Sequence, residues 1–358
     1  MNVALAGLPL AGKTCLFDAL SEGAVDSGAH PARADHPNVA TVAVPDQRLD
    51  WLYEHYKPPK RVPAHIELLD LPGLTPGRSD LAAQNTAVME HLRRADTLVY
   101  VLRAFESDRV PGRLDPKANR DVLDGEFLIS DLDVILRRIE KIERQIVKPL
   151  PNRDALKHEL EFLARCREAL EAEQPLHDIA QTEAERAVLG NFAALTQKPV
   201  VTVLNVGEQD ASSPGEAAEV YDGLSRPLVA LCASLEAEIS QLPPDERAVF
   251  MEEMGLDRMH ALDLLPAVHE AQDRITFYTT GDKEVAARSI PRGATAVEAA
   301  GDVHTDMARG FIRAEVVAFD DLKSAGHIKQ ARADGHVRLE GRDYAVQDGD
   351  IILFHFSR

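Results

Sequence analysis

Short apolar runs of strand length recur along the first part of the chain, and most of them end in a polar or glycine-containing signature. The first run spans residues 2–6, and later runs span 65–69, 97–102, 199–204 and 228–231. Near-continuous apolar runs of this length are typical of strands that are buried on both faces of a parallel sheet. Ligands of such sheets bind beyond the carboxyl ends of the strands. The pattern therefore predicts a doubly wound α/β domain with its site at those ends.

The first run leads directly into an unbroken Gly-x-x-x-x-Gly-Lys-Thr string, residues 7–14, and a helix-like stretch follows over residues 15–20. Glycines let backbone N–H groups close around phosphates, Lys13 brings a positive charge to the outer phosphates, and the Thr14 hydroxyl can ligate Mg²⁺. A merely glycine-rich turn would not require the strand before and the helix after. We therefore expect a nucleoside triphosphate and Mg²⁺ to bind here. The predicted contacts are Gly7, Leu8, Pro9, Leu10, Ala11, Gly12, Lys13, Thr14 and Cys15.

Three further signatures follow apolar runs, in the order that P-loop NTPases use. Residues 70–73 form the Asp-x-x-Gly that in these proteins senses Mg²⁺ and the terminal phosphate, although alone it also occurs in ordinary turns. Residues 205–208 stand where a GTPase carries its base-reading Asn-Lys-x-Asp, and residues 232–234 where such folds place a second base-side loop. Together the four signatures predict Lys13 and Asp70 as catalytic residues and Thr14 and Asp70 as metal ligands. The predicted base-side residues are Asn205, Val206, Glu208, Cys232 and Ala233.

A different pattern lies between the second signature, at residues 70–73, and the third, at residues 205–208. Apolar residues recur at intervals of four and three, the period of a helical heptad seam, at Leu128, Leu132, Ile135, Ile139, Ile142 and Ile146. Residues 148–152 then break the helix, and a second series begins at Leu156. This predicts an antiparallel helical hairpin inserted into the nucleotide-binding domain; two helices packed on the main sheet are the alternative. Because no catalytic group stands out on the hairpin, we expect it to act as an arm that contacts a partner.

After about residue 275 the pattern changes to short strands separated by glycine-containing turns, which predicts a small mixed β domain. The predicted strands include residues 275–279, 312–317, 337–339 and 351–354. His304 and Asp306 lie near a predicted helix, where capping and surface roles are commoner than catalysis. The predicted domains are residues 1–127 with 199–274 for nucleotide binding, 128–198 for the hairpin and 275–358 for the β domain.

Composition limits the partners. The 358 residues carry a formal charge of −19, which argues against a broad nucleic-acid-wrapping surface and against DNA. Residues 275–358 contain 11 Lys and Arg against 13 Asp and Glu, so this segment is nearly neutral and can meet RNA locally. No apolar run reaches the length of a membrane span, and no basic segment precedes the first run, so we expect neither a membrane segment nor a signal peptide. Three scattered cysteines fit a reducing cytoplasm.

Taken together, these motifs resemble the YchF-type Obg-like ATPases of the translation-factor-related P-loop class. The resemblance covers almost the whole chain. It implies a nucleotide-binding domain, an inserted helical arm and a C-terminal TGS domain with a ubiquitin-like β-grasp fold, and also weak ATPase activity and association with the ribosome or its RNA. The matching segments are residues 7–9, 12–14, 37–39, 44–49, 70–74, 105–106, 205–208, 232–233, 304–306 and 309–316.

The chain departs from this family pattern in the switches. Ala34 stands where the first switch usually has a Mg²⁺-ligating Thr, and Leu10 stands in place of the usual Asn. Residues 81–85 replace a Gly-rich segment, which predicts a less flexible second switch. The loop at 107–113 lacks the histidine that relatives often carry, and Leu74 cannot hydrogen-bond to an attacking water. We therefore expect a weak P-loop ATPase, an acid anhydride hydrolase; a nucleotide-gated binding module with negligible turnover and a GTPase are the alternatives.

Overall fold

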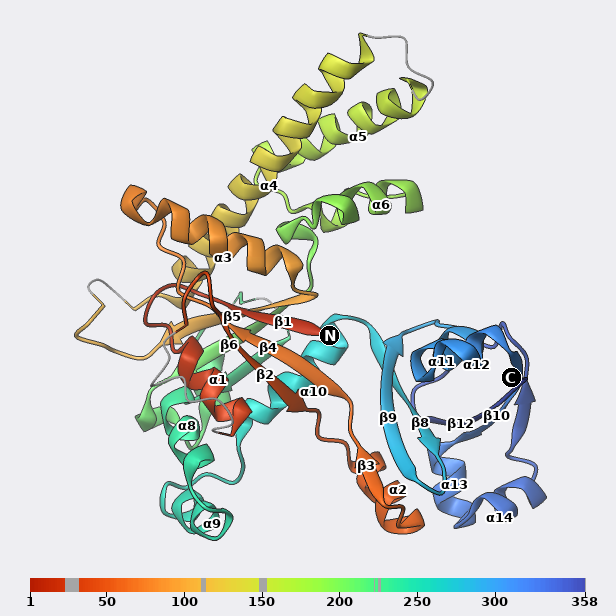
Figure 1. Ribbon diagram of the computed structural model, residues 1–358. Coiled ribbons are helices and arrows are strands. Elements are labelled where there is room, and N and C mark those ends of the chain that lie inside the picture. Colours follow the sequence, from red (N-terminus) through yellow and green to blue (C-terminus); the bar gives the residue numbers. More distant parts are fainter. Residues whose placement is uncertain (23–31, 111–113, 148–152, 222, 225–226, 358) are drawn as a thin grey trace. The chain divides into compact units, whose positions relative to one another are not determined.

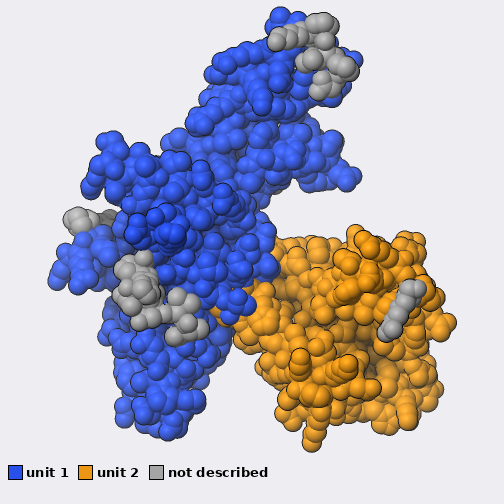
Figure 2. Space-filling model, viewed as in Figure 1, with its two compact units in different colours: residues 1–41, 67–264 blue, residues 42–66, 265–358 orange. Residues whose placement is uncertain are grey.

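The computed structural model describes residues 1–22, 32–110, 114–147, 153–221, 223–224 and 227–357. The chain divides into two compact units, which Figure 2 colours separately. Unit 1 comprises residues 1–41 and 67–264, and unit 2 comprises residues 42–66 and 265–358.

The sheet at the centre of unit 1 has the strand order β2-β4-β1-β5-β6-β7 (Figure 1). The pairs β4–β1, β1–β5, β5–β6 and β6–β7 are all parallel. Every residue of β5 is buried, as the continuous apolar pattern predicted. The predicted α/β fold is therefore confirmed. The strands are β1 (Asn2–Ala6), β2 (Asn38–Ala43), β4 (His65–Asp70), β5 (Thr97–Ala104), β6 (Val200–Val206) and β7 (Leu228–Leu231).

Helices cover this sheet with the apolar faces that their sequences provide. Val88 and Leu92 of α3, Leu123 and Phe127 of α4, and Ile239 of α8 belong to one buried cluster with side chains of the central strands. The helix α1 begins at the end of the phosphate loop and packs against α8. The helices of unit 1 are α1 (Lys13–Ser21), α3 (Ala82–Arg94), α7 (Pro214–Glu219), α8 (Ala233–Gln241) and α9 (Pro244–Glu253). The helix α10 (Leu264–Ala271) begins at the last residue of unit 1 and otherwise belongs to unit 2.

The heptad seam forms a helical hairpin, in which α4 (Pro116–Ile146) and α5 (Arg153–Glu171) run side by side (Figure 1). Its three central isoleucines are buried against α5 and α6 (Glu183–Phe192) in a cluster that contains no strand residue. The hairpin thus has a core of its own. The predicted break at 148–152 lies outside the described residues. The helix α4 starts earlier than the periodicity indicated, because Asp115 caps it at Ala118 N and Pro116 occupies its first turn.

Unit 2 contains a mixed sheet with the strand order β11-β10-β12-β8-β9-β3. The pairs β8–β9, β10–β12 and β10–β11 are antiparallel, whereas β12–β8 and β3–β9 are parallel. Residues of α11 pack on one face of this sheet. The remaining elements are β3 (Lys60–Val62), β8 (Arg274–Thr280), β9 (Glu284–Pro291), β10 (Phe311–Ala318), β11 (Arg338–Glu340), β12 (Asp350–Phe356), α11 (Ala296–Val303), α12 (Thr305–Arg309), α13 (Phe319–Ala325) and α14 (Ile328–Ala333).

One segment differs from the expected division. Residues 42–66, which the sequence analysis placed in the nucleotide-binding domain, belong to unit 2 through β3 and α2 (Gln47–Tyr56). The Arg48 guanidinium pairs with Asp348 at 2.7 Å, and the Tyr278 hydroxyl donates to Asp46 at 2.6 Å. Asp46 also caps α2. This segment is held by partners that lie more than 200 positions away, which no local pattern reveals.

Candidate nucleotide-binding site

The loop between β1 and α1 turns through backbone conformations that favour glycine. Gly12 has φ of 95°, and a Cβ there would lie 2.0 Å from Asn205 Nδ2. Gly73 of the Asp-x-x-Gly signature approaches so closely that a Cβ would lie 2.4 Å from Pro9 N. The phosphate loop and the second switch are therefore in backbone contact. Leu10 also has positive φ, 62°, a conformation that Asn adopts more readily than Leu.

Lys13 lies folded against the phosphate loop. Its ammonium donates to the carbonyl oxygens of Gly7 at 3.3 Å and Leu8 at 3.0 Å, and the residue is only 6% exposed. Burial lowers the pKa of Lys13 to about 8, and the nearby Asp70 carboxylate opposes that effect. This cation is poorly hydrated and has only neutral carbonyls as hydrogen-bond acceptors. An anion such as a phosphate group is a stronger acceptor than either carbonyl.

Asp70 ends β4 beside α1, where the Thr14 hydroxyl donates to Asp70 Oδ2 at 2.9 Å. The Asn38 amide adds a long hydrogen bond of 3.5 Å to the same oxygen. Burial raises the pKa of the Asp70 carboxyl, and the Thr14, Lys13 and Asn38 groups partly oppose this rise. The other oxygen, Oδ1, is buried and has no hydrogen-bond partner among the described residues. Buried oxygens are normally satisfied, so a carboxylate oxygen left free beside a hydroxyl fits a hard cation such as Mg²⁺.

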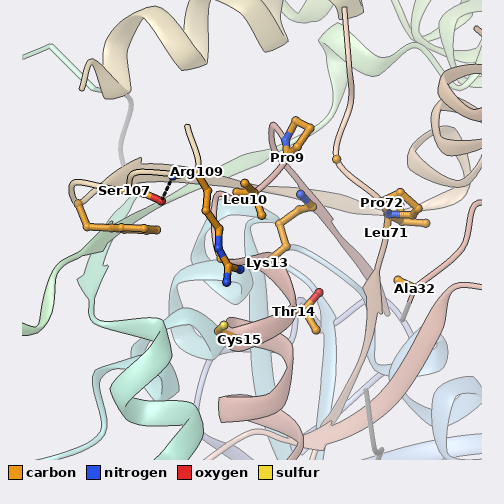
Figure 3. A pocket seen from close by; sticks show the side chains of 13 residues that line it. Pro9, Leu10, Lys13, Thr14, Cys15, Ala32, Leu71, Pro72, Ser107 and Arg109 are labelled. Atoms are coloured by element: carbon orange, nitrogen blue, oxygen red, sulfur yellow. Dashed lines mark hydrogen bonds between the residues drawn. The ribbon is translucent and has the colours of Figure 1, made fainter. Parts of the chain in front are cut away.

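A cavity of about 500 Å³ opens between the phosphate loop, the second switch and the loop after β5 (Figure 3). Its lining brings Lys13 and Thr14 together with Phe105, Ser107 and Arg109, and none of the described residues that line it carries a carboxylate. A positive, carboxylate-free cavity of this size suits a phosphate chain. The lining residues are Pro9, Leu10, Gly12, Lys13, Thr14, Cys15, Ala32, Leu71, Pro72, Gly73, Phe105, Ser107 and Arg109.

Asn205 joins two loops of the site. Its Nδ2 donates to Ala11 O at 3.0 Å, and its Oδ1 accepts from Ala233 N at 2.9 Å. The side chain therefore holds the phosphate loop against the start of α8 and retains one amide N–H for another acceptor. Glu208 is exposed at the end of β6, whereas Val206 and Cys232 are buried. None of the predicted base-side residues lines the cavity described above.

The switch departures have structural counterparts. The Ala34 carbonyl lies 3.1 Å from His91 Nε2, so α3 contacts the first switch. Leu74 is buried, and its N–H donates to Gly7 O at 3.1 Å. Asn85, in the first turns of α3, exchanges two hydrogen bonds with the Thr75 backbone, at 2.9 and 3.2 Å. The segment that replaces the glycine-rich stretch is thus mostly helical and fastened to the second switch.

Sequence reasoning did not single out Asn38, His91 or Arg109. Asn38 and His91 contact the site through partners 32 and 57 positions away, which leave no local signal. Arg109 lies soon after the buried strand β5, which pairs with β1. Because that strand was predicted, the position of Arg109 near the carboxyl ends of the strands could also have been predicted. In the sequence analysis, the loop that contains Arg109 attracted attention only because it lacks a histidine.

Comparisons with known proteins match both parts of the chain. The family model described as "50S ribosome-binding GTPase" matches residues 2–147. The YchF-GTPase_C model, described as "Protein of unknown function (DUF933)", matches residues 274–357. No helix in the described part of the chain combines the length and apolarity that crossing a membrane requires.

Full-length relatives and a solved structure cover nearly the whole chain. The ribosome-binding ATPase YchF of Bacillus subtilis (strain 168) is 34% identical over 366 residues, which cover 100% of this chain and 99% of that protein. Obg-like ATPase 1 of Caenorhabditis elegans is 32% identical over 370 residues, which cover 100% of this chain and 92% of that protein. The structure of the Schizosaccharomyces pombe YchF GTPase superposes with a TM-score of 0.81 at 26% identity, covering 99% of this chain and 97% of that one.

Proposed function

Because the chain belongs to the family of YchF and Obg-like ATPases, we propose that it is an ATP-binding switch protein of the cytoplasm that hydrolyses ATP slowly and associates with the ribosome. The observation that carries the nucleotide part is the meeting of Lys13, Thr14 and Asp70 at the ends of β1 and β4. One buried oxygen of Asp70 has no hydrogen-bond partner among the described residues, and the described residues that line the adjacent cavity carry no carboxylate. The ribosome part rests on the names of the relatives.

The residues of the chain have separable roles in this proposal. Backbone N–H groups of residues 7–15 surround the phosphates, and the Lys13 ammonium exchanges its carbonyl partners for outer phosphate oxygens. Thr14 and Asp70 would hold Mg²⁺, and the bound ion would neutralise charge on the phosphates. In the reaction, the oxygen of a water bonds to the γ-phosphorus. The bond from that phosphorus to the β–γ bridging oxygen breaks, which releases ADP, phosphate and a proton.

Slow turnover follows from what the chain lacks near the reacting phosphate. Leu74, at the position that orients the attacking water in Ras-like proteins, is an apolar residue buried in the core. Ala34 has no side-chain oxygen for the metal, and its carbonyl faces His91. Binding requires neither residue. The second candidate, a nucleotide-gated binding module with negligible turnover, is favoured by the same two positions.

We expect ATP to bind about tenfold or more tightly than GTP. A GTPase reads guanine with an Asp that accepts from N1–H and the 2-amino group, whereas Glu208 here is longer and exposed and Val206 offers no Lys stem. The remaining N–H of Asn205 suits adenine N7, and each unpaired polar group costs roughly 1–3 kcal/mol. Titration of each nucleotide in the presence of Mg²⁺ measures its affinity, and single-turnover assays then measure the rate of its hydrolysis. Equal or tighter GTP binding contradicts the preference and supports the GTPase alternative.

We propose that the helical hairpin and the C-terminal domain, a TGS-type module, form the ribosome contacts. Five arginines of this domain form ion pairs in the structure: Arg288, Arg292, Arg309, Arg332 and Arg338. Arg313 and Arg342 are exposed and form no ion pair among the described residues, so they are the better candidates for RNA phosphate.

Replacement of both Arg313 and Arg342 by alanine is expected to weaken cosedimentation with ribosomes and to reduce its salt dependence, because two phosphate contacts are lost. The control is Arg292→Ala, whose guanidinium already pairs with Asp273 at 2.7 Å. Cosedimentation is measured with ATP, with ADP and without nucleotide across a salt series. Absence of cosedimentation at low salt in every nucleotide state overturns the ribosome proposal.

A further inference from the structure

We propose that Arg109 binds the terminal phosphate of the bound nucleoside triphosphate and stabilises the charge that develops during its hydrolysis. This inference rests on the proposed function, because it assigns a cation to the same reaction. It adds a residue from the loop after β5 to a site otherwise built from the phosphate loop and the second switch.

The loop that carries Arg109 is held at the edge of the sheet. It begins where β5, buried throughout and parallel to β1, ends at Ala104. The Arg103 guanidinium donates to Phe105 O at 2.8 Å, which fixes the first residue of the loop. Ser107 then closes a turn, since its Oγ accepts from Arg109 N at 3.3 Å and its carbonyl from Val110 N at 3.1 Å. The backbone at Arg109 is therefore oriented by its neighbours.

The side chain of Arg109 extends toward the phosphate loop. It lines the same cavity as Lys13 and Thr14, and in the view of Figure 3 its guanidinium lies beside Lys13 and above Cys15. Arg109 is exposed and forms no ion pair with a carboxylate in the described part of the chain, although the sequence contains 59 Asp and Glu. Two cations that face one carboxylate-free cavity repel each other unless an anion lies between them. A triphosphate supplies such an anion.

The chemistry of a guanidinium fits the terminal phosphate. Its planar fork donates two parallel N–H bonds to phosphate oxygens, and it stays protonated at every physiological pH. As the bond to the bridging oxygen breaks, negative charge shifts onto that oxygen and spreads over the transferred group, where a fixed cation stabilises it. Arg109 forms no covalent bond and transfers no proton. Because ADP lacks the terminal phosphate, Arg109 should distinguish ATP from ADP.

The test compares wild type, Arg109→Ala and Arg109→Lys in the full-length protein with Mg²⁺. Single-turnover hydrolysis of ATP is expected to fall at least about tenfold in Arg109→Ala and less in Arg109→Lys, which keeps the charge but loses the fork. Affinity for a non-hydrolysable ATP analogue should fall, while affinity for ADP stays within about twofold. The control is Arg144→Ala, an exposed arginine on α4 that pairs with Glu140, and it should match wild type.

The outcomes separate the two claims. If wild type binds no nucleotide, the proposed function fails. If wild type binds and hydrolyses ATP while Arg109→Ala has the same rate and the same ATP-to-ADP affinity ratio, the Arg109 inference is overturned. An equal loss of ATP and ADP affinity also overturns it, because the residue then acts on binding in general. Thermal unfolding of each variant shows that the comparison is between folded proteins.

Discussion

Replacement of Asp131 by alanine is expected to destabilise unit 1 by about 3–5 kcal/mol, the cost of removing one partner of a buried ion pair. Asp131 lies on α4 with 1% of its surface exposed. Its carboxylate accepts from Arg93 at 2.7 Å, from the N–H groups of Leu195 and Thr196 at 3.0 and 2.9 Å, and from the Thr196 hydroxyl at 2.9 Å. Alanine would leave these donors without their acceptor in a buried place.

Asp133 on the same helix provides a matched control. It pairs with Arg137 one turn away, and both side chains are more than half exposed. An exposed pair of this kind contributes a few tenths of a kcal/mol, so Asp133→Ala should stay within about 0.5 kcal/mol of wild type. Calorimetric scans and urea titrations compare the three proteins. Equal stability of Asp131→Ala and Asp133→Ala contradicts the role assigned to Asp131.

The Asp131 network also joins the arm to the second switch. Arg93 lies near the end of α3, whose first turns bind Thr75 through Asn85. The same guanidinium contacts Ser130 at 2.8 Å and the Ala193 carbonyl at 3.2 Å. If nucleotide binding displaced α3, Arg93 would therefore move against its partners on α4 and against Ala193, the two places where the hairpin joins the rest of unit 1. This supports the arm as the part of the molecule that reports nucleotide state to a partner.

The fold was largely predictable because its signals are local. The phosphate loop follows a buried strand, the heptad seam spans one helix, and five of the six strands of the main sheet contain a single apolar run. The exception is β2, whose residues alternate between buried and exposed, and the sequence analysis did not predict it. The segment at 42–66 was assigned differently because Leu49 and Leu52 are equally suited to either unit. Their partner Tyr278 lies 226 or more positions away, beyond the range of any periodic pattern.

The site was predictable in part for the same reason. Thr14 and Asp70 meet as expected, since Asp70 ends β4 and Thr14 lies in the first turn of α1, after the loop that follows the neighbouring strand β1. The position of Asn205 near the end of β6 was predictable, but its two partners were not, because it contacts backbone groups of Ala11 and Ala233 that leave no signal in the sequence. The roles of these residues toward ATP and Mg²⁺ stay predictions that the binding assays test.

The affinity for ATP is expected to decrease roughly eightfold between pH 7.5 and pH 9, with Lys13 as the cause. Burial lowers the pKa of free Lys13 to about 8, so this side chain is mostly protonated at pH 7.5 and mostly neutral at pH 9. Bound phosphates favour the ammonium and raise its pKa. Above pH 8, binding must therefore take up a proton, which weakens it as the pH rises. Calorimetric titration in two buffers of different ionisation enthalpy measures that proton.

Two variants isolate this contribution. Lys13→Ala removes charge-assisted hydrogen bonds worth about 1.5–3 kcal/mol, so ATP affinity should fall roughly 10- to 150-fold and lose its dependence on pH over this range. In Lys13→Arg the guanidinium stays protonated to far higher pH, so the ATP affinity of this variant should not change between pH 7.5 and pH 9. If both variants show the wild-type decrease, another group binds the proton, and the low pKa of Lys13 does not govern nucleotide binding.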